Sequence, residues 1–229
     1  MQALQAAGNE YTVKIYKNHG APGPLYGVKV ADLKKLQKKI KKDHALALEL
    51  FDTRNSDAMY LASLIADETR VTKQELDHWA NNARWHLISD YAVAGLAADS
   101  PHGWQMGLKW IASDSEFVAS AGWCALGGWL SRKEDEEIDY KKTEELLRHI
   151  EQNIHQSPNR VRYSMNSFVI VTGGYLPLFT QECIKMAATI GKVQVNMGNT
   201  ACKVPFAPDY IKKMTANGKA PRKKKMVRC

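Results

Sequence analysis

His86 and Asp90 are the two side chains of this sequence whose types and spacing could do chemistry together. Asp90 lies in the apolar stretch 87–96, where Tyr91 is the other ionisable residue. A buried carboxylate is costly unless a partner holds its charge or a reaction uses it. In a helix, positions i and i+4 share one face, so the imidazole can pair with the carboxylate. The residues alone leave open whether this pair is a structural contact or a reactive site.

Two stretches of the sequence concentrate positive charge. Residues 29–42 hold seven lysines and one aspartate, and their apolar residues recur at helical spacing. Residues 210–229 hold eight Lys or Arg and no acid, so residues 1–209 are balanced although the whole chain has a net charge of +8. We predict a basic helix and a cationic tail that bind phosphates, the alternatives being a solvated helix face and a frayed terminus. The candidate lysines are Lys34, Lys35, Lys38, Lys223, Lys224 and Lys225.

These side chains must be positioned by helices, because nearly every segment has helical apolar spacing and strand-like alternation is scarce. Helix starts with capping residues recur, each preceded by another amphipathic helix, at a spacing of roughly 40 residues that is typical of HEAT-type solenoids. The predicted pairs are 45–51 with 55–65, 104–112 with 113–124, and 141–154 with 157–168. We predict an all-α chain of HEAT-like helix-pair repeats that form a curved α-solenoid with a concave groove. Helix 84–98 lines that groove or the centre, and one domain (1–209) precedes the basic tail (210–229).

Several classes of protein do not fit the sequence. No stretch approaches the roughly 20 apolar residues that cross a bilayer, and the first residues lack the pattern of a secretory signal. The four cysteines are widely spaced without a C-x-x-C pair, and the Gly-rich phosphate loop, G-x-S-x-G and H-E-x-x-H motifs are missing. We expect a monomer of the reduced cytoplasm, without a membrane anchor, metal or cofactor.

Three segments together resemble a known family. LYGVKVADLKKL (25–36) resembles its N-terminal motif, WHLISDYAV (85–93) its catalytic-helix motif, and KWIASDSEFVASA (109–121) the region of its sixth to eighth helices. The family is the bacterial HEAT-like alkylpurine DNA glycosylases of the AlkD-like DNA alkylation repair superfamily. The similarity runs from about residue 10 to about residue 190 and excludes the basic tail.

The resemblance implies a bacterial protein that binds duplex DNA, alkylated or distorted, in the concave groove. In the family, an aspartate stabilises the positive charge that develops on deoxyribose when an N3- or N7-alkylated purine leaves. Two tryptophans lie against the sugar and backbone, an arginine contacts phosphate, and no metal or cofactor is needed. The aspartate falls on Asp90. The tryptophans fall on His86 and Phe168, and the arginine falls on Ser120. One of the four positions is therefore identical, Phe168 is similar because it keeps an aromatic face, and the positions of His86 and Ser120 are lost.

Three further residues are candidates for the nucleic-acid contact that Ser120 cannot supply. Trp123 lies three residues after Ser120 and shares its helix face, although a tryptophan in such a pattern is also typical core. Arg160 and Arg162 open the helix that carries Phe168, where a cation opposes the helix dipole unless it binds an anion. We therefore predict that both arginines contact phosphate.

Three functions remain after these observations. The first is a DNA-binding HEAT-like protein with weak or no glycosylase activity, which favours distorted or branched DNA. The second is an active alkylpurine DNA glycosylase with an altered site, and the third is a scaffold for protein partners. The cationic helix and tail favour the first two over the third, and the residues at positions 86 and 120 favour the first over the second.

Overall fold

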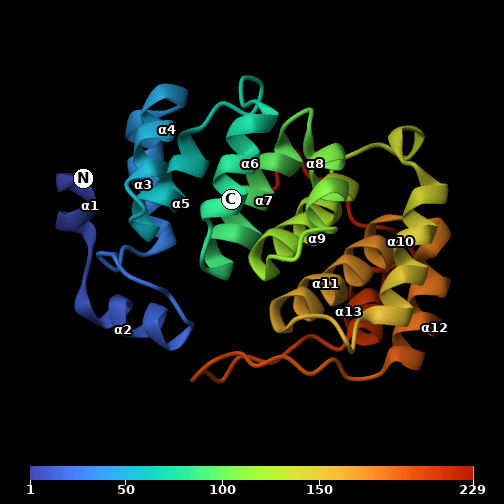
Figure 1. The fold of residues 1–229 in the computed structure, drawn as a ribbon. Coiled ribbons are helices and arrows are strands. Elements are labelled where there is room, and N and C mark those ends of the chain that lie inside the picture. Colours follow the sequence, from blue (N-terminus) through green and yellow to red (C-terminus); the bar gives the residue numbers. More distant parts are fainter. Residues whose placement is uncertain (229) are drawn as a thin grey trace.

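The computed structural model describes residues 1–228, and these residues form helices joined by turns and loops (Figure 1). The predicted all-α class is therefore confirmed. The helices are α1 Gln2–Ala7, α2 Glu10–Asn18, α3 Val30–Ile40, α4 His44–Asp52, α5 Ser56–Ile65, α6 Lys73–Asn82, η1 Leu87–Val93, α7 Ala94–Asp99, α8 Gly103–Trp110, α9 Glu116–Leu130, η2 Asp135–Glu137, α10 Tyr140–Asn153, α11 Asn159–Tyr175, η3 Pro177–Phe179, α12 Thr180–Ile190 and α13 Ala207–Met214.

Helix pairs organise the chain, as the recurring caps predict. α4 packs on α5 and α8 packs on α9. In the third predicted pair, α10 precedes α11 but makes its larger contact with α12. The predicted cap at the start of α5 is present, since the side chain of Asn55 accepts hydrogen bonds from the backbone of Asp57 and Ala58. No helix among the described residues is both long and apolar enough to cross a membrane.

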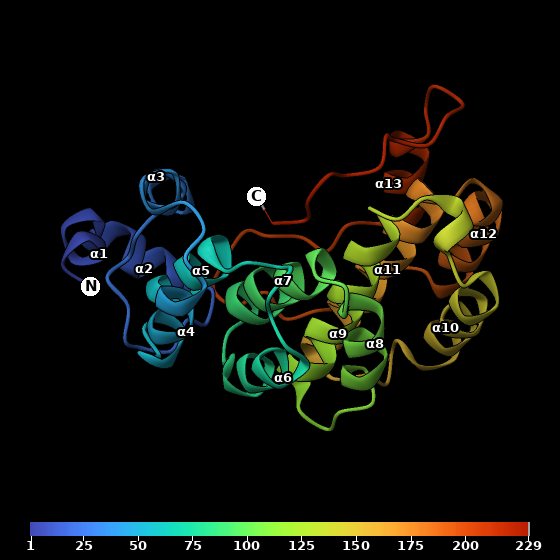
Figure 2. The ribbon, with the colours of Figure 1, turned by 90° about the horizontal axis from the view of Figure 1, so that it is seen from above.

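The pairs stack along an arc (Figure 2). Helices α4, α6, α8 and α10 follow its outer side, and α5, α7, α9 and α11 follow its inner side. We call the concave side of these four helices the inner face. The basic helix α3 flanks one end of this face and α13 flanks the other. The predicted concave surface is thus present, and the helix that carries Asp90 belongs to its inner layer.

Large aromatic side chains fill the core between the two layers. Phe51 of α4 stacks on Trp79 of α6 with ring centroids 4.1 Å apart, and both are buried. A second apolar cluster joins α9 to α13 and includes Trp123, Phe168 and Leu147. Burial of aromatic surface on this scale holds the helices in fixed positions, which is what a precise inner face requires.

A buried carboxylate fixes the segment that leads into the basic helix. Asp57 of α5 accepts hydrogen bonds from the backbone N–H groups of Tyr26, Gly27 and Val28, at 2.5, 3.0 and 3.0 Å. Gly27 has φ of +76°, a conformation that glycine adopts without strain. The N-terminal motif recognised in the sequence is therefore a carboxylate-binding turn that places α3 against α5.

The basic C-terminal region is packed on the solenoid. The predicted boundary between residues 209 and 210 falls inside α13, whose Ile211 is fully buried against α11 and α12. Beyond α13, residues 219–228 cross the inner face and hydrogen-bond to it (Figure 2). The alternative of a frayed terminus is corrected, because the burial of Ile211 and the hydrogen bonds of Val227 and Arg228 hold this region against the helices; phosphate binding by its basic residues stays a prediction.

Candidate functional site

Asp90 lies in a π-helix, η1, at the start of the inner helix that continues as α7. A π-helix is wider than an α-helix and is frequently found at functional sites. Here the wider turn places Ile88, Ser89 and Asp90 inside the fold, and 2% of the Asp90 side chain is exposed. The sequence predicted an ordinary helix over this stretch.

Three groups saturate the Asp90 carboxylate. Arg160 donates from Nε to Oδ2 at 2.6 Å, while the hydroxyls of Ser120 and Ser89 donate to Oδ1 at 2.8 and 2.7 Å. The expected Asp90–His86 pair is corrected, because the side chains that hydrogen-bond to this carboxylate within residues 1–228 are those of Ser89, Ser120 and Arg160. The charge partner comes from a helix far along the chain, which local spacing cannot indicate.

The electrostatics of Asp90 reflect this enclosure. Burial raises the pKa of its carboxyl group, and the charge of Arg160 and the hydrogen bonds from Ser89, Arg160 and Ser120 oppose that rise by favouring the ionised form. A guanidinium in contact with the carboxylate also cancels much of its field. The arrangement stabilises a buried ion pair, and it presents no free carboxylate oxygen to an approaching sugar.

Arg160 is itself held in place by two neighbours. Glu116, at the start of α9, accepts a hydrogen bond from the backbone N–H of Arg160 at 2.5 Å. The guanidinium carbon lies 4.1 Å from the centre of the Tyr163 ring, a cation–π contact. The sequence argument that an arginine at this helix start needs an anion is sound, but the anion is internal. The predicted role of Arg160 as a phosphate contact is therefore corrected, since its side chain is buried against Asp90.

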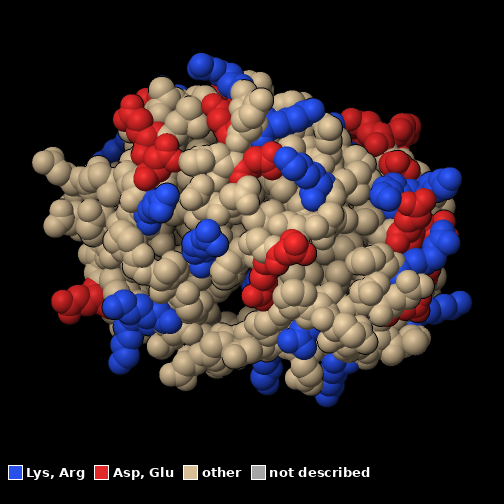
Figure 3. Space-filling view, in the orientation of Figure 1, with Lys and Arg blue, Asp and Glu red and all other residues tan. Residues whose placement is uncertain are grey.

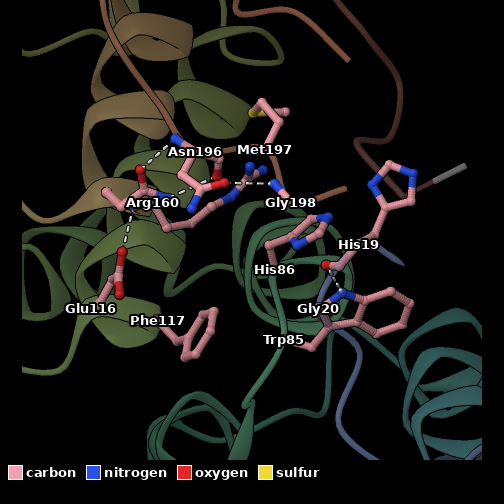
Figure 4. Close-up of a pocket in the computed structure, with 11 residues that line it drawn as sticks. His19, Gly20, Trp85, His86, Glu116, Phe117, Arg160, Asn196, Met197 and Gly198 are labelled. Carbon is pink, nitrogen blue, oxygen red and sulfur yellow. Dashed lines mark hydrogen bonds between the residues drawn. The ribbon is translucent and has the colours of Figure 1, made fainter. Parts of the chain in front are cut away.

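His86 lies beside the ion pair and takes no part in it. Burial, together with the charge of Arg160 and of His19, lowers the pKa of His86 to about 3, so its imidazole is neutral at physiological pH. The rings of His86 and His19 are tilted by 58° to each other, with centroids 6.2 Å apart. Figure 4 shows both rings beside Trp85, whose Nε1 donates to the carbonyl of His19 at 2.9 Å.

A cavity of about 270 Å³ opens next to this group. It is visible in Figure 3 as a hollow below the centre of the molecule, with acidic side chains at its rim. The loop 191–206 covers one side of it. Asn196 of this loop exchanges hydrogen bonds with Asn159 of α11 at 3.0 and 2.7 Å, and Asn199 donates its N–H to the carbonyl of Asn18 at 3.2 Å. The lining residues are His19, Gly20, Trp85, His86, Glu116, Phe117, Asn159, Arg160, Asn196, Met197 and Gly198.

Three predicted nucleic-acid contacts lie in the interior and are corrected. Ser120 is 0% exposed and serves Asp90, while Trp123 and Phe168 are each 1% exposed. The two aromatic rings pack edge to face, and Trp123 also stacks on His149. Because their surfaces are covered by other side chains, none of the three can touch DNA in this conformation. The small or apolar residues that surround them in the sequence are typical of a buried helix.

The remaining predicted contacts lie at or near the surface. Arg162 is partly buried, and its Nε has no hydrogen-bond partner within the described part of the chain. Lys35 pairs with Asp32 on α3 at 2.7 Å, and Lys223 pairs with Asp135 at 3.1 Å. Lys35, Lys38, Lys224 and Lys225 are exposed, and Lys34 and Lys223 are partly buried.

Residues that the sequence did not indicate also belong to the site. His19, Glu116 and Asn196 reach the cavity from a loop, a helix start and a second loop, and no periodic pattern marks them. The Arg at the start of α11 was the one available signal of a distant acid.

Comparisons with known proteins agree with this architecture. The family described as DNA alkylation repair enzyme matches residues 1–186. The uncharacterized proteins Lin0241 of Listeria innocua and Lmo0209 of Listeria monocytogenes are each 35% identical over 216 residues, which is 92% of this chain and 93% of theirs. A solved structure is 34% identical with a TM-score of 0.90, and the match covers 100% of this chain and 97% of that one.

That structure is described as a new family of proteins related to the HEAT-like repeat DNA glycosylases with affinity for branched DNA structures. Its likeness confirms the predicted HEAT-like repeat fold. The family match spans most of the chain and includes all three segments that carry the sequence resemblance. The chain therefore belongs to the DNA alkylation repair enzyme family.

Proposed function

We propose that the protein binds branched or distorted DNA on its inner face and does not use Asp90 to excise bases. The observation that carries the second part is the closed ion pair of Asp90 with Arg160 inside the body of the solenoid. A carboxylate that stabilises a sugar cation must be able to approach it, and this one is 2% exposed.

Other features of the site support the same conclusion. The position of one family tryptophan is taken by the neutral, half-buried His86, and the position of the other by the fully buried Phe168. Ser120, at the position of the family arginine, donates its hydroxyl hydrogen bond to Asp90. Opening the site would require the Asp90–Arg160 pair to separate, which is costly for two charges out of water.

Binding of DNA is supported by the family and by the distribution of charge. The solved relative is described as having affinity for branched DNA structures. In this chain, the basic helix α3 and the basic residues after α13 flank and cross the inner face (Figure 2). On the outer face, acidic and basic side chains are interspersed (Figure 3). A ligand rich in phosphate is therefore favoured on the inner side.

The binding proposal is tested by titrating fluorescently labelled DNA with the full chain at several salt concentrations. The probes are a four-way junction, a nicked or bulged duplex and a plain duplex of the same sequence. We expect the junction to bind most tightly, and log K to fall linearly with log[salt] by roughly 0.9 per phosphate contact. Equal affinity for all probes overturns the preference for branched DNA, and no binding at low salt overturns the proposal.

The second part is tested by measuring base release from methylated DNA. We expect release of 7-methylguanine and 3-methyladenine by the wild type to equal the uncatalysed background. Release that is above background and is lost in Asp90→Asn would show instead that the buried carboxylate is reached by substrate. In that case the protein acts as an alkylpurine DNA glycosylase.

A further inference from the structure

The ten residues that follow the loop after α13 form a strap across the inner face. We call residues 219–228 the strap. Its backbone is tied to the turn that follows α9, because Lys224 donates its N–H to the carbonyl of Ser131 at 2.8 Å and Arg132 donates from Nε to the carbonyl of Lys225 at 3.2 Å. Its far end is tied to α7, where the N–H of Val227 donates to Oδ1 of Asp99 at 2.8 Å.

Arg228 is the strongest attachment of the strap. Its Nε donates to Oδ2 of Asp99 at 2.8 Å and its Nη2 to Oε2 of Glu68 at 2.6 Å. Its Nη1 donates to the carbonyls of Ser63 and Ala66 at 2.5 and 3.1 Å. These carbonyls belong to the C-terminal end of α5, where unpaired acceptors and the helix dipole both attract a cation. The side chain is 3% exposed, which is unusual for an arginine near the end of a chain segment without regular structure.

The inner face has space for this side chain because α7 carries a glycine. A Cβ atom at Gly95 would lie 3.0 Å from Cγ of Arg228, and the other atoms that it would approach also belong to Arg228. Glycine is an unfavourable residue within a helix, so its use at this position gives no local advantage. The missing side chain at Gly95 leaves the space that the Arg228 side chain occupies, so α7 and the strap are complementary in shape at this point.

The strap also changes the charge of the surface that it covers. Without it, the acids Asp99 and Glu68 would face the concave side at the ends of α7 and α5. With it, Arg228 neutralises this acidic region, and Arg222, Lys224 and Lys225 are exposed on the strap. The strap therefore replaces negative charge by positive charge on the side of the molecule that also carries α3 (Figure 2).

We propose that Arg228 anchors the strap as a fixed part of the DNA-facing surface, and that Arg222, Lys224 and Lys225 on it contact the phosphates of branched DNA. This inference rests on the proposed function, which supplies the ligand. It differs from binding by a free cationic arm, because Arg228, which does not itself touch DNA, holds Arg222, Lys224 and Lys225 in the positions from which they bind phosphate. Ordered cations lose less conformational freedom on binding than cations on a flexible segment do.

The test compares variants that displace the strap with variants that only remove charge. Arg228→Gln removes the anchor, and Gly95→Leu fills the space of the Arg228 side chain without changing any charge. The matched control is Lys219→Gln, an exposed strap residue that removes one charge and leaves the anchor. The triple variant Arg222→Gln/Lys224→Gln/Lys225→Gln removes the proposed phosphate contacts.

Affinity for the labelled four-way junction is measured against salt for each protein. We expect Arg228→Gln and Gly95→Leu each to weaken binding on the order of tenfold and Lys219→Gln by less than about threefold. The triple variant should lower the salt slope by about 2.7, or 0.9 per lost contact. Equal effects of Arg228→Gln and Lys219→Gln overturn the anchor, and tighter binding by Gly95→Leu overturns it in favour of a strap that obstructs the DNA.

A second readout separates the anchor from DNA binding. Trypsin cleavage after residues 222–225 is followed without DNA, and it should be slow in the wild type and at least about tenfold faster in Arg228→Gln and Gly95→Leu, because cleavage follows the population of the detached strap. Unchanged cleavage overturns the anchor even where DNA binding is intact. Faster cleavage with no DNA binding by the wild type supports the anchor, overturns the phosphate contacts and refutes the proposed function.

Discussion

Asp90 and Asp99 are two buried carboxylates on the same inner segment, one in the π-helix and the other at the end of α7. Each is nearly inaccessible, with 2% and 0% of the side chain exposed, and each binds an arginine from a distant part of the chain. Arg160 reaches Asp90 from α11, and Arg228 reaches Asp99 from the strap. Asp99 also lies 3.4 Å from Nε of Arg132.

The comparison shows that an acid in an apolar helix does not by itself identify a reactive site. The resemblance to DNA glycosylases marks Asp90 as catalytic, whereas nothing marks Asp99. The structure gives both the same chemistry, a carboxylate whose charge is held by a guanidinium and by further hydrogen bonds. The difference between them is the context of the arginine, because Arg160 belongs to helix α11 in the body of the solenoid, whereas Arg228 belongs to the strap, which has no helical structure.

The largest expected effect comes from removing the arginines one at a time. Arg160→Met leaves a charge buried in the body, and we expect a loss of about 3–5 kcal/mol in the free energy of unfolding. Arg228→Met should cost about 1–2 kcal/mol, because the strap can leave and water can reach Asp99. Urea denaturation at pH 7 measures both.

The double variant Asp90→Leu/Arg160→Met is the control for the first loss. Replacing a buried pair by apolar residues removes the unpaired charge, so most of the stability should return. Equal losses in Arg160→Met and Arg228→Met would contradict the distinction drawn between a fixed and a detachable partner.

An intermediate effect is expected from pH. The pKa of His86 is about 3 in the folded protein and about 6.5 in an unfolded chain, so the unfolded state takes up this proton first. Stability from this group is complete above pH 6.5 and is lost as the pH falls towards 3. The raised pKa of Asp90 acts in the opposite direction, since it favours the folded state in acid.

His86→Gln isolates the first contribution. The difference in Tm between wild type and variant should be constant above pH 7. Between pH 6.5 and pH 4, the Tm of the wild type should fall by more than the Tm of the variant. A difference that stays constant over this range would mean that the imidazole is not shielded from protons. It would also mean that the region of Asp90 is more open than that of Asp99.

The smallest effect is expected on α3, away from the Asp90–Arg160 and Asp99–Arg228 ion pairs. Lys35 is exposed and pairs with Asp32 one helical turn away, so Lys35→Gln should leave the urea midpoint of unfolding essentially unchanged. If α3 contributes phosphate contacts, the same change should lower the salt slope of junction binding by up to about 0.9. A slope equal to that of wild type would restrict the DNA-facing surface to the strap side.

The sequence predicted the features that depend on local pattern. Apolar spacing and caps such as Asn55 located the helix pairs, and the basic character of α3 followed from its lysines. The π-helix around Asp90 was not predictable, because this segment packs against α5 and α9, and such contacts between separate helices leave no local sequence pattern. Likewise, Arg160 lies 70 residues from Asp90, and periodicity carries no information about such a contact.

The irregular segments were missed for a related reason. Loop 191–206 and the strap have no repeating pattern, and their positions depend on hydrogen bonds to residues distant in sequence, among them Asn159, Asn18 and Asp99. Composition alone made residues 210–229 look like a free basic tail. It could not show that Arg228 has a buried acceptor site.

Loop 191–206 has a mechanical consequence. An open stack of helix pairs behaves as a spring, whose ends can move apart while each contact changes only slightly. In this protein, Asn199 joins the late helices to Asn18 near the beginning, and Asn196 joins the same loop to α11. The two ends are thereby connected across the gap, and we expect this connection to limit how far the arc can open.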